Sequence, residues 1–304
     1  MKKLVLLFML SISMGTLIAC GNGGFDESSS INVYTRDTSS GTRAGFMNGI
    51  GFDAAVTDDS VLVSGFSIND NAGIMNAMTT DVSGIGYISI SSLNDTIKPL
   101  NFNGIEPSMD NVIDDTYDLK RPFNYILRLE EDYDSETKYQ IARALETFIL
   151  TPEGVDAIND AGAIGLEVDN SASLDNHSVC QQDNGSITFN VGGSNSVTRV
   201  AKSLTDAFGP RCGDIDFVHN HTGSSDAFKR TQDDEKDSVN ALDFGFASRD
   251  FYSEEMVNDE KYYGQAAWDA IVIIVHNDNP LDNLEHETVK AIYNGEIMTW
   301  EDIE

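Results

Sequence analysis

One short segment combines an arginine with a run of small hydroxyl residues. Residues 31–46 read INVYTRDTSSGTRAGF, in which an alternating strand pattern leads to Arg36 and then to TSSGT (residues 38–42) before a helical run. Hydroxyl groups and the free backbone N–H groups of a helix start point beyond the helix end, where they can surround an anion. Arg36 would add charge and can bond two oxygens at once. A plain helix cap with a surface arginine is the alternative.

The same arrangement of strand, small residues and helix occurs twice more. A strand pattern at 187–191 leads to GGSNS and the helical run VTRVAKSLTDAF, and one at 215–218 leads to TGSS and DAFKRTQ. Each turn places Ser or Thr where a helix N-cap is expected, and each lacks bulk, so a ligand can approach the backbone closely. One such turn is explained by capping alone. Three predict helix ends that converge on an anion.

Signatures of catalysis are scarce. The chain has no G-x-S-x-G, H-E-x-x-H or Walker motif, and no base stands beside its serines in the sequence. His219 and His221 share one face of a strand, but no third metal ligand is indicated nearby, so polar strand-edge residues are favoured over a metal site. The acidic runs 130–132 and 233–235 are typical of solvated turns. We therefore predict a binding protein, not an enzyme, without cofactor or metal.

The elements that must position these turns alternate along the chain. Residues 135–150 carry an apolar stripe at helical spacing, Thr151-Pro152-Glu153 starts a further helix, and residues 283–293 form an amphipathic pattern that stops at Asn294-Gly295. Strands and helices in alternation predict an α/β architecture with a largely parallel sheet. The polar run 167–186 is the best internal linker.

Composition sets limits on the partners. The 304 residues suffice for one large or two medium α/β domains, and 50 acidic against 19 basic residues give a net charge of −31. Such an excess argues against nucleic acid or anionic lipid as a partner. A small anion remains possible as a ligand, since surface charges are screened beyond about 8 Å at physiological salt. Solubility in a salty exterior explains the excess most simply.

The N-terminus has the pattern of an export signal. Lys2 and Lys3 precede an apolar run too short for a stable membrane span, and the run ends in LIAC (17–20), which resembles the lipobox of bacterial lipoproteins. This resemblance implies a signal peptide at 1–19, a lipid on Cys20 and a lipid-anchored tether at 20–30. The alternative is an ordinary cleaved signal with a chance cysteine. An oxidising exterior would permit Cys180 and Cys212 to pair, but the sequence does not decide it.

Six segments together resemble one family. They are TRDTSSGTRAGF, VSGIGYISI, NGIEPSMDNVIDDTYDLKRPF, GGSNSV, FGFASRDF and IYNGEIMTWEDI, and the match covers nearly the whole chain after residue 30. They resemble the phosphate-binding proteins of bacterial ABC uptake systems. The resemblance implies a type II periplasmic-binding-protein fold, in which two α/β lobes joined by two crossover strands close over phosphate.

The resemblance carries over to individual positions. The family's arginine and S-G-T helix cap match Arg36 and residues 40–42, and its other loops match residues 194–196, 224–225 and 248–249. The implied ligand-binding residues are Arg36, Ser39, Ser40, Gly41, Thr42, Ser194, Asn195, Ser196, Ser224, Ser225, Ser248 and Arg249.

Two positions depart from the family pattern. Many members carry an acid in the third loop that accepts the proton of hydrogen phosphate and excludes sulfate, whereas this chain has Ser248-Arg249. Thr38 stands where some members carry an acid that supports the arginine. The resemblance therefore leaves the proton acceptor, and the discrimination between phosphate and sulfate, undefined.

The order of the segments differs from the family's usual order. GGSNSV usually comes in the first half and the arginine-containing segment follows IYNGEIMTWEDI, and joining Glu304 to Ile31 would restore this order. We therefore predict a circular permutant, and a truncated tandem chain is the alternative. The permutant would have a discontinuous lobe, 31–91 plus 276–304, that carries SSGT. Its other lobe, 92–275, would be continuous and carry GGSNSV, TGSSD and FGFASR.

The resemblance also implies partners and a location. The expected partners are inorganic phosphate and the permease subunits of an ABC phosphate importer. The expected protein is a monomer outside the cytoplasm, attached to the outer face of the membrane by its lipid only. Another tetrahedral oxyanion, a phosphate sensor and a surface phosphatase are the alternatives.

Overall fold

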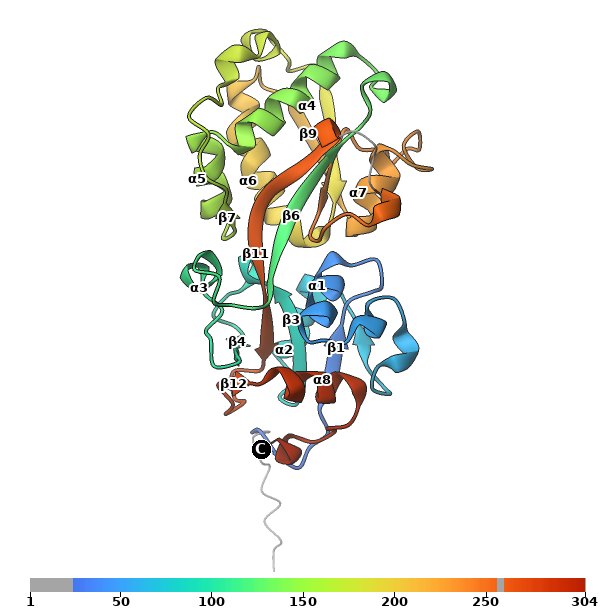
Figure 1. Cartoon of the computed structure of the whole chain (residues 1–304), viewed down its shortest axis with the longest axis vertical. Coiled ribbons are helices and arrows are strands. Elements are labelled where there is room, and N and C mark those ends of the chain that lie inside the picture. Colours follow the sequence, from blue (N-terminus) through green and yellow to red (C-terminus); the bar gives the residue numbers. More distant parts are fainter. Residues whose placement is uncertain (1–23, 256–259, 304) are drawn as a thin grey trace, which may run out of the picture.

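Two lobes, joined by two long strands, make up the molecule (Figure 1). The structure is a computed structural model that describes residues 24–255 and 260–303. The predicted signal peptide and Cys20 lie outside the described residues. Within the described part of the chain, no helix is both long enough and apolar enough to cross a membrane.

The first lobe, the lower one in Figure 1, is built around β1 (Asn32–Thr35). This strand pairs in parallel with β2 (Ser67–Ile68) and with β3 (Gly84–Ser89). In the core, the rings of Phe46 and Tyr87 stack 3.9 Å apart, and Tyr293 packs on Phe46. The other elements of this lobe are α1 (Gly41–Gly49), α2 (Asn71–Met78), β4 (Lys98–Pro99), β5 (Asn101–Phe102), α3 (Met109–Ile113), β12 (Asn283–Leu284) and α8 (His286–Asn294).

The second lobe, the upper one in Figure 1, has β8 (Thr188–Gly193) at its centre. Strand β8 pairs in parallel with β9 (Asp216–His221) and β10 (Phe244–Ala247). The helices are α4 (Glu136–Ile149), α5 (Pro152–Asp160), α6 (Thr198–Phe208) and α7 (Ser224–Thr231), with the short β7 (Ile164–Gly165). The predicted cap of α5 is confirmed, because the Thr151 hydroxyl accepts a hydrogen bond from the Gly154 N–H at 3.1 Å.

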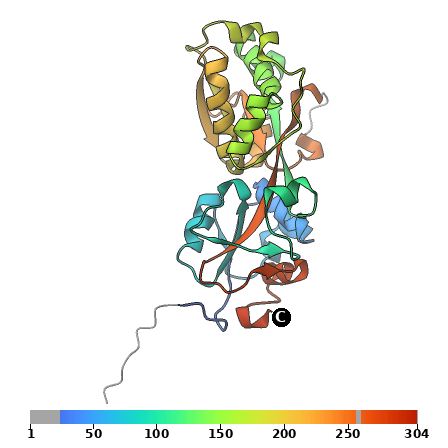
Figure 2. The same ribbon diagram turned by 90° about the vertical axis from the view of Figure 1, so that its left-hand side faces the viewer.

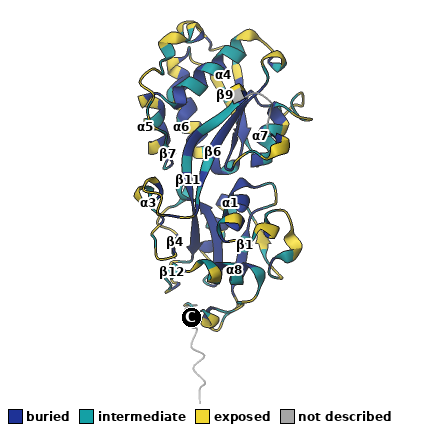
Figure 3. Ribbon diagram, in the orientation of Figure 1, coloured by how far each residue is buried: buried dark blue, intermediate teal, exposed yellow. Residues whose placement is uncertain are grey.

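Two crossover strands run between the lobes, β6 (Lys120–Leu127) and β11 (Tyr263–Val275). They pair with each other, and also with β10 and β3, in antiparallel fashion. The sheet therefore follows the order β2-β1-β3-β11-β6-β10-β8-β9 through both lobes. The prediction of a largely parallel sheet holds within each lobe but is wrong for the crossovers, which traverse the molecule in opposite directions. Both crossovers are largely buried (Figure 3).

The boundary between the two hydrophobic cores falls within the crossover strands. The first lobe's core includes Leu100, Phe102 and Leu119, whereas Phe123 and Ala267 belong to the core of the second. Residues 92–119 therefore pack with the first lobe, which differs from the predicted boundary at residues 91/92. In this segment, β4 pairs with the end of β11, and β5 pairs with β12, which leads into α8. The helix predicted at 283–293 begins only at His286, because β12 pairs with β5.

The two ends of the described chain lie side by side (Figures 1 and 2). Ser30 forms an antiparallel bridge with Thr299, and the Ile31 N–H donates to the Met298 carbonyl at 2.8 Å. The sequence predicted that Ile31 and Glu304 would lie close, and Glu304 itself is outside the described residues. Close ends are a requirement of the predicted permutation and do not by themselves establish it.

Trp300 anchors the C-terminal segment to the first lobe. It is 4% exposed, packs on Phe25, and its indole N–H donates to the Ser83 carbonyl at 3.2 Å. Truncating a buried Trp to Ala typically costs about 3–5 kcal/mol. We expect Trp300→Ala to lower the free energy of unfolding by about that amount in urea denaturation. A loss below about 1 kcal/mol would show that this segment contributes little to the lobe.

A disulfide joins Cys180 and Cys212. Cys180 lies in the predicted linker 167–186, which contains two short 3-10 turns, and Cys212 follows the end of α6. The bond therefore fastens the linker to the second lobe.

Candidate functional site

The starts of three helical segments meet where the lobes face each other. The N-terminus of α1 approaches α7 and the end of β10 so closely that a Cβ atom on Gly41 would lie 2.4 Å from Ser224 Oγ and 2.6 Å from Ser248 Oγ. The 3-10 turn Asn195–Val197, which leads into α6, reaches α1 through Ser196. The convergence that the three similar turns predicted is therefore present.

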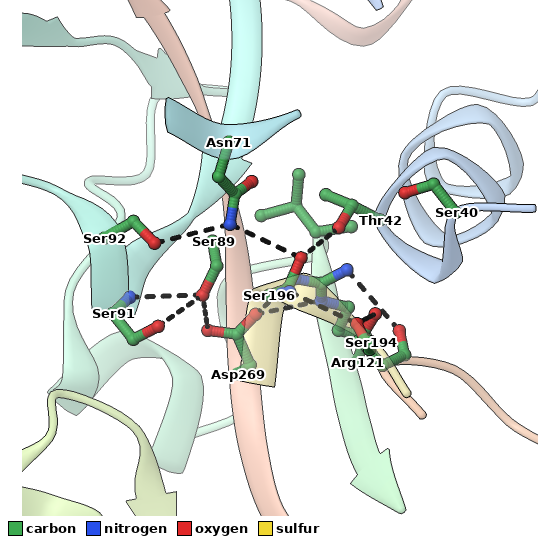
Figure 4. Close-up of polar contacts among 12 residues, drawn as sticks. Ser40, Thr42, Asn71, Ser89, Ser91, Ser92, Arg121, Ser194, Ser196 and Asp269 are labelled. Atoms are coloured by element: carbon green, nitrogen blue, oxygen red, sulfur yellow. Dashed lines mark hydrogen bonds and ion pairs between the residues drawn. The ribbon is translucent and has the colours of Figure 1, made fainter. Parts of the chain in front are cut away.

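Five buried hydroxyls gather at this point, and we name them the hydroxyl cluster: Thr42, Ser194, Ser196, Ser224 and Ser248. Thr42 Oγ1 and Ser196 Oγ are 2.6 Å apart, across the lobes (Figure 4). Ser194 Oγ donates to Ser248 Oγ at 2.9 Å, and Ser224 Oγ lies 3.1 Å from Ser248 Oγ. Each side chain is at most 2% exposed. Hydroxyls both donate and accept, so the cluster can reorient its protons around an oxyanion.

Most of these hydroxyls are not used as helix caps. Ser40 does cap α1, with its Oγ accepting from the Arg43 N–H at 3.4 Å. The N-cap of α7 is Gly223 rather than a serine, and α6 begins after Val197 without a side-chain cap. Ser194 does cap the 3-10 turn that leads into α6, with its Oγ accepting from the Ser196 N–H at 3.3 Å, so the expectation of a Ser or Thr cap at each turn is wrong only for α7. The Ser224 hydroxyl instead accepts from the Ser248 N–H at 3.0 Å and lies beside Gly41 of the other lobe.

Arg36 is the buried cation beside the cluster. Its side chain is 1% exposed, and its Nη1 donates to Asn71 Oδ1 at 2.7 Å and to Thr42 Oγ1 at 3.2 Å. Its Nη2 donates across the cleft to Asn195 Oδ1. Its Nε is buried without a hydrogen-bond partner among the described residues. Burial lowers the pKa of Arg36 to about 10, and the charge of Arg121 acts in the same direction.

Arg36 differs from the other buried arginines in its partners. Arg43, Arg121 and Arg249 each lie within ion-pair distance of a carboxylate, from Asp59, Asp269 and Glu255. Within residues 24–255 and 260–303, no carboxylate comes that close to Arg36. A buried arginine charge without a counterion is what an anion site requires. Arg43 instead supports the loop, since its Nη1 donates to the Arg36 carbonyl at 2.9 Å.

Several implied ligand residues point away from the hydroxyl cluster. Arg249 pairs with Glu255 at 2.6 and 2.8 Å and lies over the Tyr252 ring. Ser225 Oγ accepts from Arg249 Nη2 at 3.1 Å, so it belongs to the same group. Ser39 donates to Asp37 and is only half-buried, and Thr38 is exposed. The structure thus brings Arg36, Gly41, Thr42, Ser194, Asn195, Ser196, Ser224 and Ser248 together.

Two pockets open beside this group. One of about 530 Å³ is lined by residues of both lobes, including Asn71 and Ser196. The other, of about 420 Å³, is lined by Gly45, Arg121 and Arg249 among others. Solvent therefore reaches the margins of the hydroxyl cluster while the cluster itself stays buried.

Comparisons with known proteins agree with this architecture. A family model described as the PBP superfamily domain matches residues 178–303. The crystal structure of a phosphate-binding protein of a phosphate ABC transporter from Streptococcus pneumoniae superimposes with a TM-score of 0.63 at 24% identity, over 91% of this chain and 100% of that chain. The chain has the fold of a periplasmic binding protein.

Curated relatives extend the similarity to the sequence. "Phosphate-binding protein PstS 2" of Streptococcus pneumoniae is 26% identical over 309 residues, which cover 99% of both chains. The protein of the same name from Streptococcus agalactiae is 27% identical over 316 residues, which cover 100% of this chain and 99% of that protein. The predicted resemblance to phosphate-binding proteins is confirmed. These relatives are named as binding proteins and not as enzymes, in agreement with the prediction.

The order of segments is the same in these relatives. Because a single alignment covers 99% of this chain and of the Streptococcus pneumoniae protein, their segments follow each other in the same sequence. The comparisons therefore do not confirm that this chain is a circular permutant, and the permutation stays a prediction.

Two polar residues near the site were missed by the sequence reasoning. Asn71, at the start of α2, accepts from Arg36 and donates to Ser196 Oγ at 3.4 Å. Arg121, on β6, donates from its Nη1 to the Ser248 carbonyl at 3.4 Å. Arg121 lies in DLKRPF, part of a segment that carries the family resemblance, and this could have identified it as a candidate site residue. Asn71 had no such signal, because its contact with Arg36 joins residues that are 35 positions apart in the chain.

The histidines of β9 do not form a metal centre. His219 Nδ1 and His221 Nε2 are 3.1 Å apart, and His221 Nδ1 lies 3.0 Å from the Ser194 carbonyl oxygen. Burial lowers the pKa of His221 to about 4, so its ring is neutral at pH 7. Among the described residues, no three His, Cys, Asp or Glu side chains are placed to hold a metal ion. His221 instead supports the backbone of the loop that carries Ser194.

Proposed function

We propose that this protein binds inorganic phosphate between its lobes and delivers it to the permease of an ABC importer. The observation that carries the proposal is Arg36, which is buried, lacks a carboxylate partner among the described residues, and faces hydroxyls from both lobes. A tetrahedral oxyanion would supply the missing countercharge. It would also accept hydrogen bonds from both lobes at once, and this favours the closed cleft.

The available donors are sufficient for useful affinity. A hydrogen bond to a charged group contributes about 1.5–3 kcal/mol net. Five hydroxyls, the Arg36 guanidinium and the first N–H groups of α1 and α7 can supply six to ten such bonds, by rough count. After the cost of association, this reaches about micromolar affinity. Among the described residues, no histidine or carboxylate hydrogen bonds to a hydroxyl of the cluster, which favours binding over chemistry on the phosphate.

The proposed location follows from the N-terminal pattern. Phosphate import requires that the binding protein meets its ligand outside the cytoplasmic membrane. The lipobox-like LIAC would place a lipid on Cys20, and residues 20–30 would tether the lobes to the outer face of the membrane. Labelling with a radioactive fatty acid, in wild type and Cys20→Ala, tests this part separately from ligand binding.

Calorimetric titration tests the binding proposal. Purified protein that has been dialysed free of anions is titrated with phosphate, arsenate and sulfate at fixed salt. We expect saturable 1:1 binding of phosphate, recovery of intact phosphate afterwards, and no hydrolysis of a generic phosphomonoester. Absence of binding up to millimolar phosphate would overturn the proposal.

A sulfate-like oxyanion is the second candidate. It is favoured by one observation: among the described residues, no carboxylate hydrogen bonds to a hydroxyl of the cluster. A carboxylate would accept the proton of hydrogen phosphate and repel sulfate, which has none at neutral pH. Sulfate binding at least as tight as phosphate binding in the same titration would decide for this candidate.

Ser224→Ala tests the role of the hydroxyl cluster. Ser224 is 0% exposed, and its Oγ accepts from the Ser248 N–H at 3.0 Å. We expect phosphate binding to weaken by about 1–3 kcal/mol, because a ligand oxygen loses its donor. Ser203→Ala is the matched control, since the Ser203 hydroxyl donates to the Ala157 carbonyl, away from the cluster. A drop in melting temperature without loss of affinity would show that Ser224 is structural.

A further inference from the structure

A second arginine lies against the hydroxyl cluster from the crossover strands. Arg121 is 3% exposed and sits on β6, directly opposite Asp269 on β11. Its Nε and Nη2 both donate to Asp269 Oδ2, at 2.9 and 2.7 Å (Figure 4). Two of the three guanidinium nitrogens are therefore committed to one carboxylate oxygen.

The third nitrogen of Arg121 is turned toward the cluster. Nη1 makes one long hydrogen bond, of 3.4 Å, to the carbonyl of Ser248, whose hydroxyl is at the centre of the cluster. An Nη group carries two protons, so this nitrogen keeps a donor for another acceptor. The charge of Arg121 also lowers the pKa of Arg36, which places the two guanidinium groups within electrostatic reach of each other.

Asp269 fixes the orientation of the Arg121 guanidinium group. It is fully buried, and its Oδ1 accepts from Ser89 Oγ at 2.7 Å at the end of β3. The Ser89 hydroxyl also lies 2.7 Å from Ser91 Oγ. Arg121 thus contacts the first lobe through Asp269 and the second through Ser248, from a strand that belongs to both.

We propose that Arg121 is a second anion-binding residue of the cleft and that Asp269 is the positioning residue that aims its Nη1 at the ligand. This inference rests on the proposed function. Two guanidinium groups and one carboxylate give this group a net charge of +1. Arg36 meets the anion from the first lobe, and Arg121 meets it from the crossover strands.

Four variants test the assignment by phosphate titration with parallel melting curves: Arg121→Gln, Arg121→Lys, Asp269→Asn, and Arg121→Gln combined with Asp269→Asn. We expect Arg121→Gln to weaken phosphate binding at least tenfold and Arg121→Lys to weaken it less. Asp269→Asn keeps a side-chain oxygen that can accept from Arg121 Nε and Nη2, so it preserves the aim of Nη1 while it removes the competing negative charge. It should therefore bind phosphate as tightly as wild type or more tightly. Arg128→Gln, a buried arginine just beyond β6 and away from the cluster, is the matched control.

The combined variant guards against a mere loss of folding. Removing both charges leaves no unpaired buried ion, so its melting temperature should recover relative to either single variant. Its phosphate affinity should nevertheless stay at least tenfold below wild type. Wild-type affinity in the combined variant, or equal losses in Arg121→Gln and Asp269→Asn, would mean that the pair is only structural and would overturn the assignment. A wild-type protein that binds no anion would instead count against the proposed function.

Discussion

Replacing Arg36 with alanine is expected to weaken phosphate binding at least tenfold while leaving the protein folded. The side chain is 1% exposed and, within the described chain, has hydrogen-bond partners but no counterion. Truncating one member of a buried charge pair costs about 2–5 kcal/mol, because the remaining charge is left unpaired in a site shielded from water. In Arg36→Ala, the charge left unpaired in the site would be that of the bound phosphate. The measurement is calorimetric titration at matched ionic strength.

Two further variants separate charge from geometry at this position. Arg36→Lys keeps the charge, but a single ammonium cannot reproduce the planar fork that reaches Asn71 and Asn195 at once, so it should also weaken binding. Arg211→Ala removes the same charge from the exposed end of α6, where Arg211 donates to the Ala207 carbonyl. It should bind phosphate as wild type does. Equal, unchanged affinity in all three variants would remove Arg36 from the site.

Local patterns made the three cleft turns predictable. Each turn is a strand end, a few small residues and a helix start, and this arrangement is written in contiguous sequence. Because the parallel strands β8 and β9 end at the same edge of their sheet, these signals also predict that the second and third turns meet. Strand β1 lies in the other lobe and runs in the opposite direction, so the meeting of its turn with the other two depends on how the lobes pack. Arg36, Thr42, Ser196 and Ser224 were therefore accessible to reasoning from the sequence.

Contacts between distant residues were not predictable in the same way. Asn71 meets Arg36 across 35 residues, and Asp269 meets Arg121 across 148. Neither pair leaves a periodic or spaced pattern, because each depends on how strands from different parts of the chain are aligned. The direction of a side chain is equally hidden: Arg249 follows Ser248 directly but turns to Glu255. The resemblance to a family identified the loop that contains Arg249, but it did not show in which direction the Arg249 side chain points.

The boundary between the lobes shows the same limit. Residues 92–119 contain only two short strands and one short helix, so their sequence does not reveal which core they join. Their side chains decide it: Leu100, Phe102 and Tyr117 are at most 1% exposed in the first lobe's core. Apolar residues in an irregular segment indicate that the segment is buried, but only the folded structure shows which lobe's core it joins.

A protein with a net charge of −31 can still hold an anion, because burial sets the local field. The hydroxyl cluster is buried between the lobes, where the charge of Arg36 acts over a few ångströms, whereas the field of the surface carboxylates is screened by solvent and salt. Nearby acids are already engaged, as Asp59 is with Arg43 and Asp269 with Arg121. The acidic surface and the anion site are therefore compatible.

Gly41→Ala is expected to weaken phosphate binding strongly by hindering closure of the cleft. Gly41 begins α1, and any residue can adopt that helical conformation, so the first lobe should fold normally. The new methyl group would instead lie 2.4 Å from Ser224 Oγ and 2.6 Å from Ser248 Oγ, both on the opposite lobe. The clash exists only when the lobes approach, so its cost falls on the closed state.

The size of the effect follows from packing. Inserting a methyl group into a tightly packed region costs about 1–3 kcal/mol, which is about 5- to 150-fold in a binding constant. Small-angle X-ray scattering should show that phosphate compacts the wild type but not Gly41→Ala, while the melting temperatures of the two ligand-free proteins agree. Gly49→Ala, at the other end of α1, is the control, because its methyl group would meet only the flexible end of Leu119. If Gly41→Ala bound phosphate as tightly as wild type, the ligand would not lie between α1 and α7.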